Sequence, residues 1–132
     1  METVKIRCKD LMVGDYIANR NGSPMQIVAV DEDNAYAWTG NEERPWIFGD
    51  NEGYEPQPII LTPEILEKNG WKETEYWHEY QDGKNTIQSC LPDMRGRING
   101  IEIEHFKCEY VHQYQHLLRL CGLDKLADNF KI

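Results

Sequence analysis

The chain has 132 residues, of which 40% are hydrophobic, 11% aromatic and 28% charged, and its mean hydropathy is -0.69. This composition is typical of a folded globular protein and excludes a disordered chain, because disordered segments contain few aromatic residues. The formal net charge of -9 disfavours a protein that coats duplex nucleic acid, since phosphate binding needs clustered Lys and Arg.

Residues 1–7 contain no apolar segment of the signal-peptide kind, and no apolar run approaches the roughly 20 residues of a membrane-spanning helix. The four cysteines are scattered along the chain and form no CxxC motif: Cys8, Cys90, Cys108 and Cys121. A disulfide framework requires an oxidising compartment. We therefore expect reduced thiols in a cytoplasmic protein.

The first sixty residues have the pattern of short strands. Val4, Ile6 and Cys8 alternate with charged residues, which is typical of a half-buried strand. Further strands are expected at 16–18, 25–30, 35–39 and 59–61, with turns at Asn21-Gly22 and at the acidic segment 31–34. Regularly spaced short strands predict a meander that curls into a small barrel. Residues 11–17 resemble the opening of many SH3-like barrels.

The second half begins with a clear helix signal. Thr62 is a good N-cap, Pro63 suits the first helical position, and Asn69-Gly70 supplies a stop. A strand at 71–80, a hairpin turn at Asp82-Gly83, a strand at 86–91 and a third strand near 101–105 are expected next, as a three-stranded antiparallel sheet.

A final helix is expected at 110–121. Its apolar side chains share one face at helical spacing: Val111, Tyr114, Leu117, Leu118 and Cys121. We expect Val111, Tyr114 and Leu118 to cover the sheet.

An acidic and aromatic segment at 31–55 is the candidate binding surface. It contains eight acidic residues, with Arg44 as the single base, and much of it falls in a long irregular stretch at 41–58 of the kind that is often functional. The residues of this segment chosen as the candidate interface are Trp38, Trp46, Phe48 and Tyr54. Exposed aromatics surrounded by charge favour partner binding, and the alternative is that Trp38 and Trp46 close one end of the barrel.

Cys108, His112 and His116 recur every four residues, with His105 just before them. Two histidines four apart on a helix are able to share one Zn²⁺. However, the motif lacks the glutamate of a metalloprotease helix, and the stripe is expected to lie opposite the apolar face, in solvent. We interpret it as a polar helix face, and predict no metal site and no catalytic residue.

Other catalytic patterns are weak. The chain has no GxxxxGK[ST] and no GxGxxG motif, so the usual nucleotide cradles are missing, and no cofactor is predicted. Carboxylates two apart, such as Glu73 with Glu75 and Glu102 with Glu104, share a strand face and are interpreted as solvated surface.

Residues 109–117 (EYVHQYQHL), 61–71 (LTPEILEKNGW) and 13–16 (VGDY) resemble, in the same order, segments of small uncharacterised phage or prophage proteins of Bacteroidetes. The resemblance implies a cytosolic accessory protein of mobile-element origin. It implies no assigned activity and no catalytic residues.

The sequence therefore predicts an α+β protein with an SH3-like barrel at 1–61 and an α-β-β-β-α subdomain at 62–132 that share one core. The predicted function is a non-enzymatic module that binds a protein partner. One alternative is an acidic mimic of nucleic acid that binds a basic protein, since residues 1–66 carry 5 basic and 12 acidic groups, a net charge of -7. The other is a small metal-dependent hydrolase that uses the C-terminal histidines.

Overall fold

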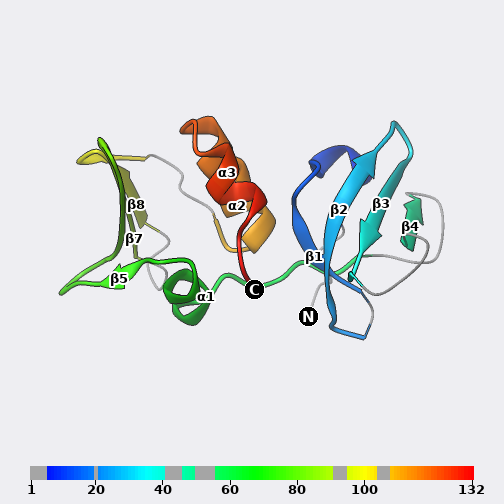
Figure 1. Cartoon of the computed structure of the whole chain (residues 1–132), viewed down its shortest axis with the longest axis horizontal. Helices are drawn as coiled ribbons and strands as arrows, with labels where there is room; N and C mark the ends of the chain where they lie inside the picture. Colours follow the sequence, from blue (N-terminus) through cyan, green and yellow to red (C-terminus); the bar gives the residue numbers. More distant parts are fainter. Residues whose placement is uncertain (1–5, 20, 41–45, 50–55, 91–94, 104–107) are drawn as a thin grey trace. The chain divides into compact units, whose positions relative to one another are not determined.

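The computed structural model describes residues 6–19, 21–40, 46–49, 56–90, 95–103 and 108–132. The chain forms two compact units, one made of 1–59 with 110–130 and the other of 60–109 with 131–132. Two antiparallel sheets and a few short helices confirm the α+β class (Figure 1). The sequence predicted a division at residue 61 that left the C-terminal helix in the second part, whereas the structure groups this helix with the first unit.

The sheet of the first unit has the strand order β1-β2-β3-β4. Its strands are β1 (Tyr16–Ala18), β2 (Pro24–Val30), β3 (Asn34–Trp38) and β4 (Trp46–Gly49). The predicted strands at 16–18, 25–30 and 35–39 are confirmed, but β4 lies in the stretch expected to be irregular. The four strands do not form a closed barrel, and Gln57 reaches the free side of β1, where it exchanges two backbone hydrogen bonds of 2.8 Å with Ala18.

The structure does not form the strand that was predicted at Ile6 and Cys8. Cys8 begins a short 3₁₀ helix (η1, Cys8–Asp10) instead, and Val4 lies outside the described residues. Alternation with charged residues was misleading here, because Ile6 and Cys8 are both buried against the sheet without pairing to it.

One face of this sheet forms the core of the unit. Alternate strand residues point to opposite faces, so Ala35 and Ala37 are buried while Trp38 is exposed. The core consists of Ile6, Cys8, Leu11, Ile17, Met25, Ile27, Ala35, Ala37 and Phe48.

Two helices complete the first unit, α2 (Val111–Leu120) and α3 (Asp124–Asp128). Three residues of the predicted apolar face of α2, Val111, Tyr114 and Leu118, are fully buried. The helix is grouped with the first unit, not with the sheet of the second half that these residues were expected to cover. The helix α3 was not predicted, since five residues are too few to show a helical period. None of the helices in the described ranges has the length and apolar composition required to span a membrane.

The second unit begins with α1 (Pro63–Lys68), whose predicted cap is confirmed because Thr62 Oγ1 accepts a hydrogen bond of 3.2 Å from the Ile65 N–H. The helix ends before Gly70, which has a φ of +97° and lies so close to Tyr80 that an added Cβ would stand 3.3 Å from its ring. Only glycine suits this combination of conformation and close approach.

The sheet of the second unit has five strands in sequence order rather than the three predicted. They are β5 (Lys72–Glu73), β6 (His78–Asp82), β7 (Asn85–Cys90), β8 (Arg95–Ile98) and β9 (Ile101–Glu102). The predicted strand at 71–80 is divided into β5 and β6 by a turn, and β8 lies where no strand was predicted. The expected strand at 59–61 is reduced to a single bridge residue, Ile60.

The core of the second unit lies between α1 and one face of its sheet. Trp71 is buried and stacks on Tyr80 with 4.5 Å between the ring centroids. Leu66 from α1 and Ile87 from β7 are buried as well. This packing fixes α1 above the sheet and so determines where its side chains point.

Candidate functional site

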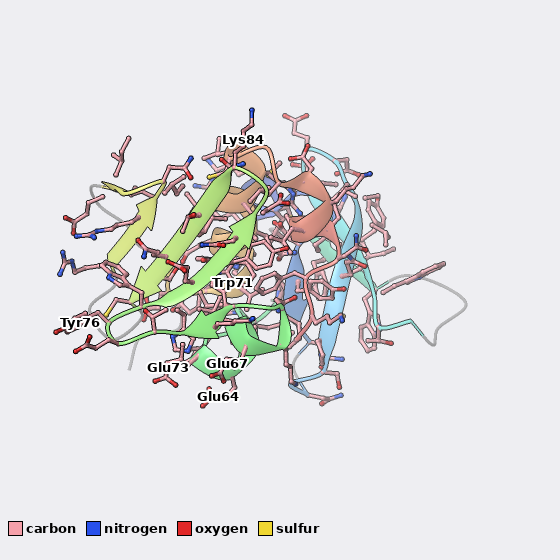
Figure 2. All side chains as sticks on the ribbon, turned by 60° about the vertical axis from the view of Figure 1, so that its left-hand side comes forward. Glu64, Glu67, Trp71, Glu73, Tyr76 and Lys84 are labelled. Atoms are coloured by element: carbon pink, nitrogen blue, oxygen red, sulfur yellow. The ribbon has the colours of Figure 1, made fainter. Side chains whose placement is uncertain are left out.

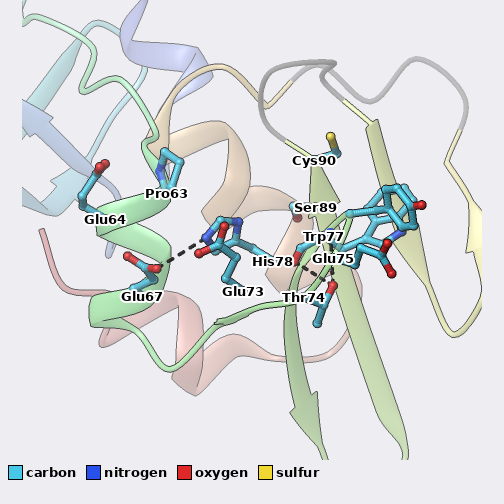
Figure 3. Close-up of a pocket in the computed structure, with 11 residues that line it drawn as sticks. Pro63, Glu64, Glu67, Glu73, Thr74, Glu75, Trp77, His78, Ser89 and Cys90 are labelled. Carbon is cyan, nitrogen blue, oxygen red and sulfur yellow. Dashed lines mark hydrogen bonds and ion pairs between the residues drawn. The ribbon is translucent and has the colours of Figure 1, made fainter.

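The second unit contains a pocket of about 420 Å³ between α1, the β5–β6 hairpin and β7 (Figure 3). Three of its side chains carry metal-binding atoms that all lie within 4.8 Å of one another, namely Glu67, Glu73 and His78. We call these three residues the Glu–Glu–His cluster. In the described part of the chain they are the one such group of three or more His, Cys, Asp or Glu side chains.

Strand register places two members of the cluster side by side. Glu73 on β5 is the direct partner of His78 on β6, and His78 is in turn the partner of Ser89 on β7. Directly opposed residues of antiparallel strands project to the same face with their Cβ atoms about 5 Å apart. The row Glu73–His78–Ser89 therefore crosses three strands on the face that α1 covers.

The turn that joins β5 to β6 is held by its own hydrogen bonds. The Thr74 N–H donates to the Trp77 carbonyl at 2.6 Å, the Thr74 hydroxyl donates to the same carbonyl at 2.9 Å, and the Trp77 N–H donates to Thr74 Oγ1 at 3.1 Å. A turn closed in this way fixes the register of the hairpin. It therefore fixes the spacing of Glu73 and His78.

The third member comes from the helix. Glu67 lies on α1, one residue after the buried Leu66, and its Oε1 lies 3.6 Å from Nε2 of His78. Figure 2 shows Glu67 and Glu73 near one another at one end of this unit, and Figure 3 shows both beside His78, whereas Glu64 points away. The cluster thus combines residues that the sequence keeps apart.

His78 is the least exposed member of the cluster, with 14% of its side chain accessible. Its Nε2 atom is shielded from solvent and has no hydrogen-bond partner, since 3.6 Å to Glu67 is too long for a hydrogen bond. Buried polar atoms are nearly always hydrogen-bonded, so an exception needs an explanation.

Sequence reasoning missed this cluster. It paired Glu73 with Glu75 as solvated surface; both line the pocket, but Glu75 is not part of the cluster. The available signals were the helix stop at Gly70 and the strand that follows it, which together bring the end of α1 back over β5.

His112 and His116 of the histidine stripe lie in the first unit. The prediction that they face solvent is wrong, because His112 is only 7% exposed and His116 Nε2 lies 2.6 Å from Oδ2 of the fully buried Asp15. Arg119 Nη1 donates to the other oxygen of Asp15 at 2.6 Å. One buried carboxylate thus anchors two side chains of α2.

A fully buried glutamine completes this anchor. The side-chain amide of Gln115 donates to the Gly14 and Ala127 carbonyls, and its Oε1 accepts from the Tyr16 N–H, each at 2.8 Å. Gly14 has a φ of +96°, and an added Cβ there would stand 2.6 Å from Oδ1 of Asp128. The loop before β1 is therefore fitted closely to α2 and α3.

The outer side of the stripe borders a cleft of about 480 Å³ that is lined by Tyr110, His112 and His116 together with Lys9 and Asp10. The described residues there do not bring three metal-binding atoms together. Burial raises the pKa of Cys108 to about 12, so in the absence of a metal ion this thiol stays protonated.

His112 predicts a pH dependence of stability. Burial lowers its pKa, Asp15 and Asp10 oppose this, and His116 adds to it. An unfolded histidine has a pKa of about 6.5, so below that pH the unfolded chain takes up a proton that the folded chain does not. Stability is therefore full above about pH 6.5 and falls as the pH drops towards the lowered pKa.

The measurement is the free energy of unfolding between pH 7.5 and 5 for the native chain and for His112→Asn. The variant is expected to lose less stability than the native chain over this range. Parallel curves for the two proteins would contradict the assignment of this pH dependence to His112.

The four aromatic residues of the candidate interface are placed differently. Phe48 is fully buried in the core of the first unit, and Trp46 packs against that core. Trp38 is 43% exposed on the opposite face of the sheet. Tyr54 lies outside the described residues. Phe48 is therefore a core residue rather than a contact residue, because positions 46 and 48 share the inward face of β4.

Trp38 belongs to an apolar surface that the sequence analysis did not define. Tyr36 lies two residues before it on β3 and is the direct partner of Ile47 on β4, and Val28 is exposed at the bulge of β2. We call Val28, Tyr36, Trp38 and Ile47 the outer face of the first sheet.

The four cysteines are all described, and none of them forms a disulfide. No family model matches this chain, and no similar curated protein or solved structure was found. Its function is therefore inferred from the chemistry and geometry of its own residues.

Proposed function

We propose that this chain is a non-enzymatic accessory protein that binds a basic partner protein through the outer face of the first sheet. The observation that carries the proposal is the grouping of exposed apolar side chains from three adjacent strands, with Trp38 and Ile47 among them. Exposed aromatic side chains are enriched where proteins bind one another.

The charge next to this face favours a basic partner. The turn between β2 and β3 exposes three consecutive acids, Asp31, Glu32 and Asp33. Asp31 accepts hydrogen bonds from two backbone N–H groups of the turn, which lower its pKa, and from the Tyr36 hydroxyl at 3.1 Å. Its negative charge is thereby fixed beside the outer face, where it attracts Lys or Arg side chains of a partner.

The open meander supports the finer proposal of an SH3-like arrangement. Four sequential antiparallel strands are followed by a segment whose Gln57 pairs with β1. The resemblance to small phage-type proteins is consistent with an accessory role in the cytoplasm.

The test compares two double variants as bait in quantitative capture experiments from the native host. Trp38→Ala with Ile47→Ser removes apolar surface from the outer face, and the control, Tyr76→Ala with Ile101→Ser, removes exposed apolar surface from the second unit, where both residues are highly exposed. A tryptophan at an interface centre typically contributes about 2 kcal/mol or more, roughly 30-fold in affinity.

We expect one partner to be retained by the native chain and by the control variant and to be lost with the outer-face variant. Retention by both variants, or equal loss from both, would contradict the proposal. Addition of duplex DNA identifies the mimic alternative, since DNA displaces the chain only from a partner that uses the same basic surface for nucleic acid.

A further inference from the structure

We propose that the Glu–Glu–His cluster of the second unit binds one divalent transition-metal ion of the Zn²⁺ class. This site is separate from the outer face of the first sheet, so it does not depend on the function proposed above. Three arguments lead to it, from the spacing of the ligand atoms, from the shielded nitrogen of His78, and from the chemistry of the donors.

The spacing of the cluster matches that of ligands around one ion. Ligand atoms at about 2.1 Å from a tetrahedral Zn²⁺ lie about 3.4 Å from one another. Nε2 of His78 and Oε1 of Glu67 are 3.6 Å apart, and all three ligand atoms of the cluster lie within 4.8 Å. The distance between Nε2 of His78 and Oε1 of Glu67 is thus too long for a hydrogen bond but close to the spacing of two ligand atoms on one metal ion.

The shielded nitrogen of His78 points to a ligand. Nε2 is covered by protein, lies 3.6 Å from Oε1 of Glu67 and makes no hydrogen bond. A neutral imidazole that binds a metal through Nε2 satisfies this atom completely. The carboxylates of Glu67 and Glu73 then balance the charge of the ion, and their exposure leaves a path for its entry.

The donor set selects the class of metal. Imidazole nitrogen suits Zn²⁺, Cu²⁺, Fe²⁺ and Ni²⁺, whereas Mg²⁺ and Ca²⁺ prefer sites made of oxygen atoms alone. Three protein ligands leave at least one coordination position for water, and the cluster borders a pocket of about 420 Å³. The site is therefore expected to bind Zn²⁺ with an open position and to bind Mg²⁺ only weakly.

The experiment is calorimetric titration of the full, tag-free chain with ZnCl₂ and with MgCl₂ after treatment with a chelator. The cluster variants are His78→Ala, Glu67→Gln and Glu73→Gln. The controls are Glu64→Gln and Glu75→Gln, which change the same charge at the border of the same pocket but outside the cluster. Circular dichroism checks that each variant is folded, and the exposed Glu73 provides a variant that leaves the core intact.

We expect the native chain to bind one Zn²⁺ and each cluster variant to lose at least about 100-fold in affinity, more than is typical for loss of a second-layer partner. The controls are expected to stay within about twofold, since they remove charge but no ligand. NMR amide shifts on Zn²⁺ addition are expected at 67 and at 73–78.

Three results would overturn the proposal. The native chain shows no saturable Zn²⁺ binding, or Glu64→Gln weakens binding as much as Glu73→Gln does, which indicates general attraction by acidic groups. The third is that His116→Asn abolishes binding while His78→Ala retains it, which places the ion at the histidine stripe of the first unit.

Discussion

Asp15→Asn is expected to lower the free energy of unfolding by roughly 3–5 kcal/mol, the range for removal of one partner from a buried ion pair. Asp15 is fully buried and receives hydrogen bonds from Arg119 at 2.6 Å and from the Met12 N–H at 2.8 Å, with His116 at 2.6 Å. The asparagine has nearly the same shape, so the loss is one of charge and of acceptor capacity rather than of packing.

The size of this effect follows from what remains after the change. Only 11% of the Arg119 side chain is exposed, so its guanidinium keeps a charge that water solvates poorly. The amide nitrogen of the asparagine is a donor, so in either orientation it faces another donor, Arg119 on one side or the Met12 N–H on the other. Urea denaturation followed by tryptophan fluorescence measures the loss.

Asp128→Asn is the matched control because Asp128 contacts the same arginine. Its Oδ1 lies 3.3 Å from Arg119 Nη2, but its side chain is 55% exposed. An exposed ion pair typically contributes about 1 kcal/mol or less, so this variant is expected to lose little stability. Equal losses for the two variants would show that burial of the Asp15 carboxylate is not what stabilises the contact.

Local signals were sufficient to predict the elements that begin or end at a special residue. The cap at Thr62, the stop at Gly70 and the hairpin turn at Asp82-Gly83 each depend on neighbouring residues alone. The elements that were missed lack such signals. The strand β8 has the sequence Arg-Gly-Arg-Ile, in which no apolar alternation is visible, and β4 and α3 are only four and five residues long.

Contacts between distant residues could not be predicted from one sequence. Asp15 and His116 are 101 residues apart, and no local pattern indicates that a turn aspartate accepts hydrogen bonds from a C-terminal helix. The apolar period of α2 identified the buried face but placed the histidines opposite it. In the structure the helix is buried over a wider arc that includes His112 and the fully buried Gln115, so a period of apolar residues underestimates the buried surface.

The same limit applies to the Glu–Glu–His cluster. Register within the β5–β6 hairpin determines that Glu73 and His78 are partners. The sequence analysis predicted one continuous strand at 71–80 and therefore no turn between these two residues. Glu67 joins them through packing of Leu66 and Trp71 in the core of the second unit. A prediction of this site needs the turn and the helix position together.

Leu118→Asp is expected to lower the free energy of unfolding by about 3–5 kcal/mol, because it places a charge in an apolar core. Leu118 on α2 is fully buried, and its carbonyl accepts hydrogen bonds from the N–H groups of Cys121 and Leu123 at the end of the helix. Domains of this size are typically stable by roughly 5–15 kcal/mol, so the variant loses a large fraction of that. The midpoint of urea denaturation is the measurement.

Leu120→Asp separates burial from every other effect of the substitution. Leu120 lies on the same helix two residues later and is 86% exposed. Both variants make the same change in helix propensity and add the same charge near the same helix end, where a carboxylate is slightly unfavourable. The difference between their stabilities therefore reports the burial of residue 118 alone. Stability lost at 120 and retained at 118 would mean that α2 buries a different face.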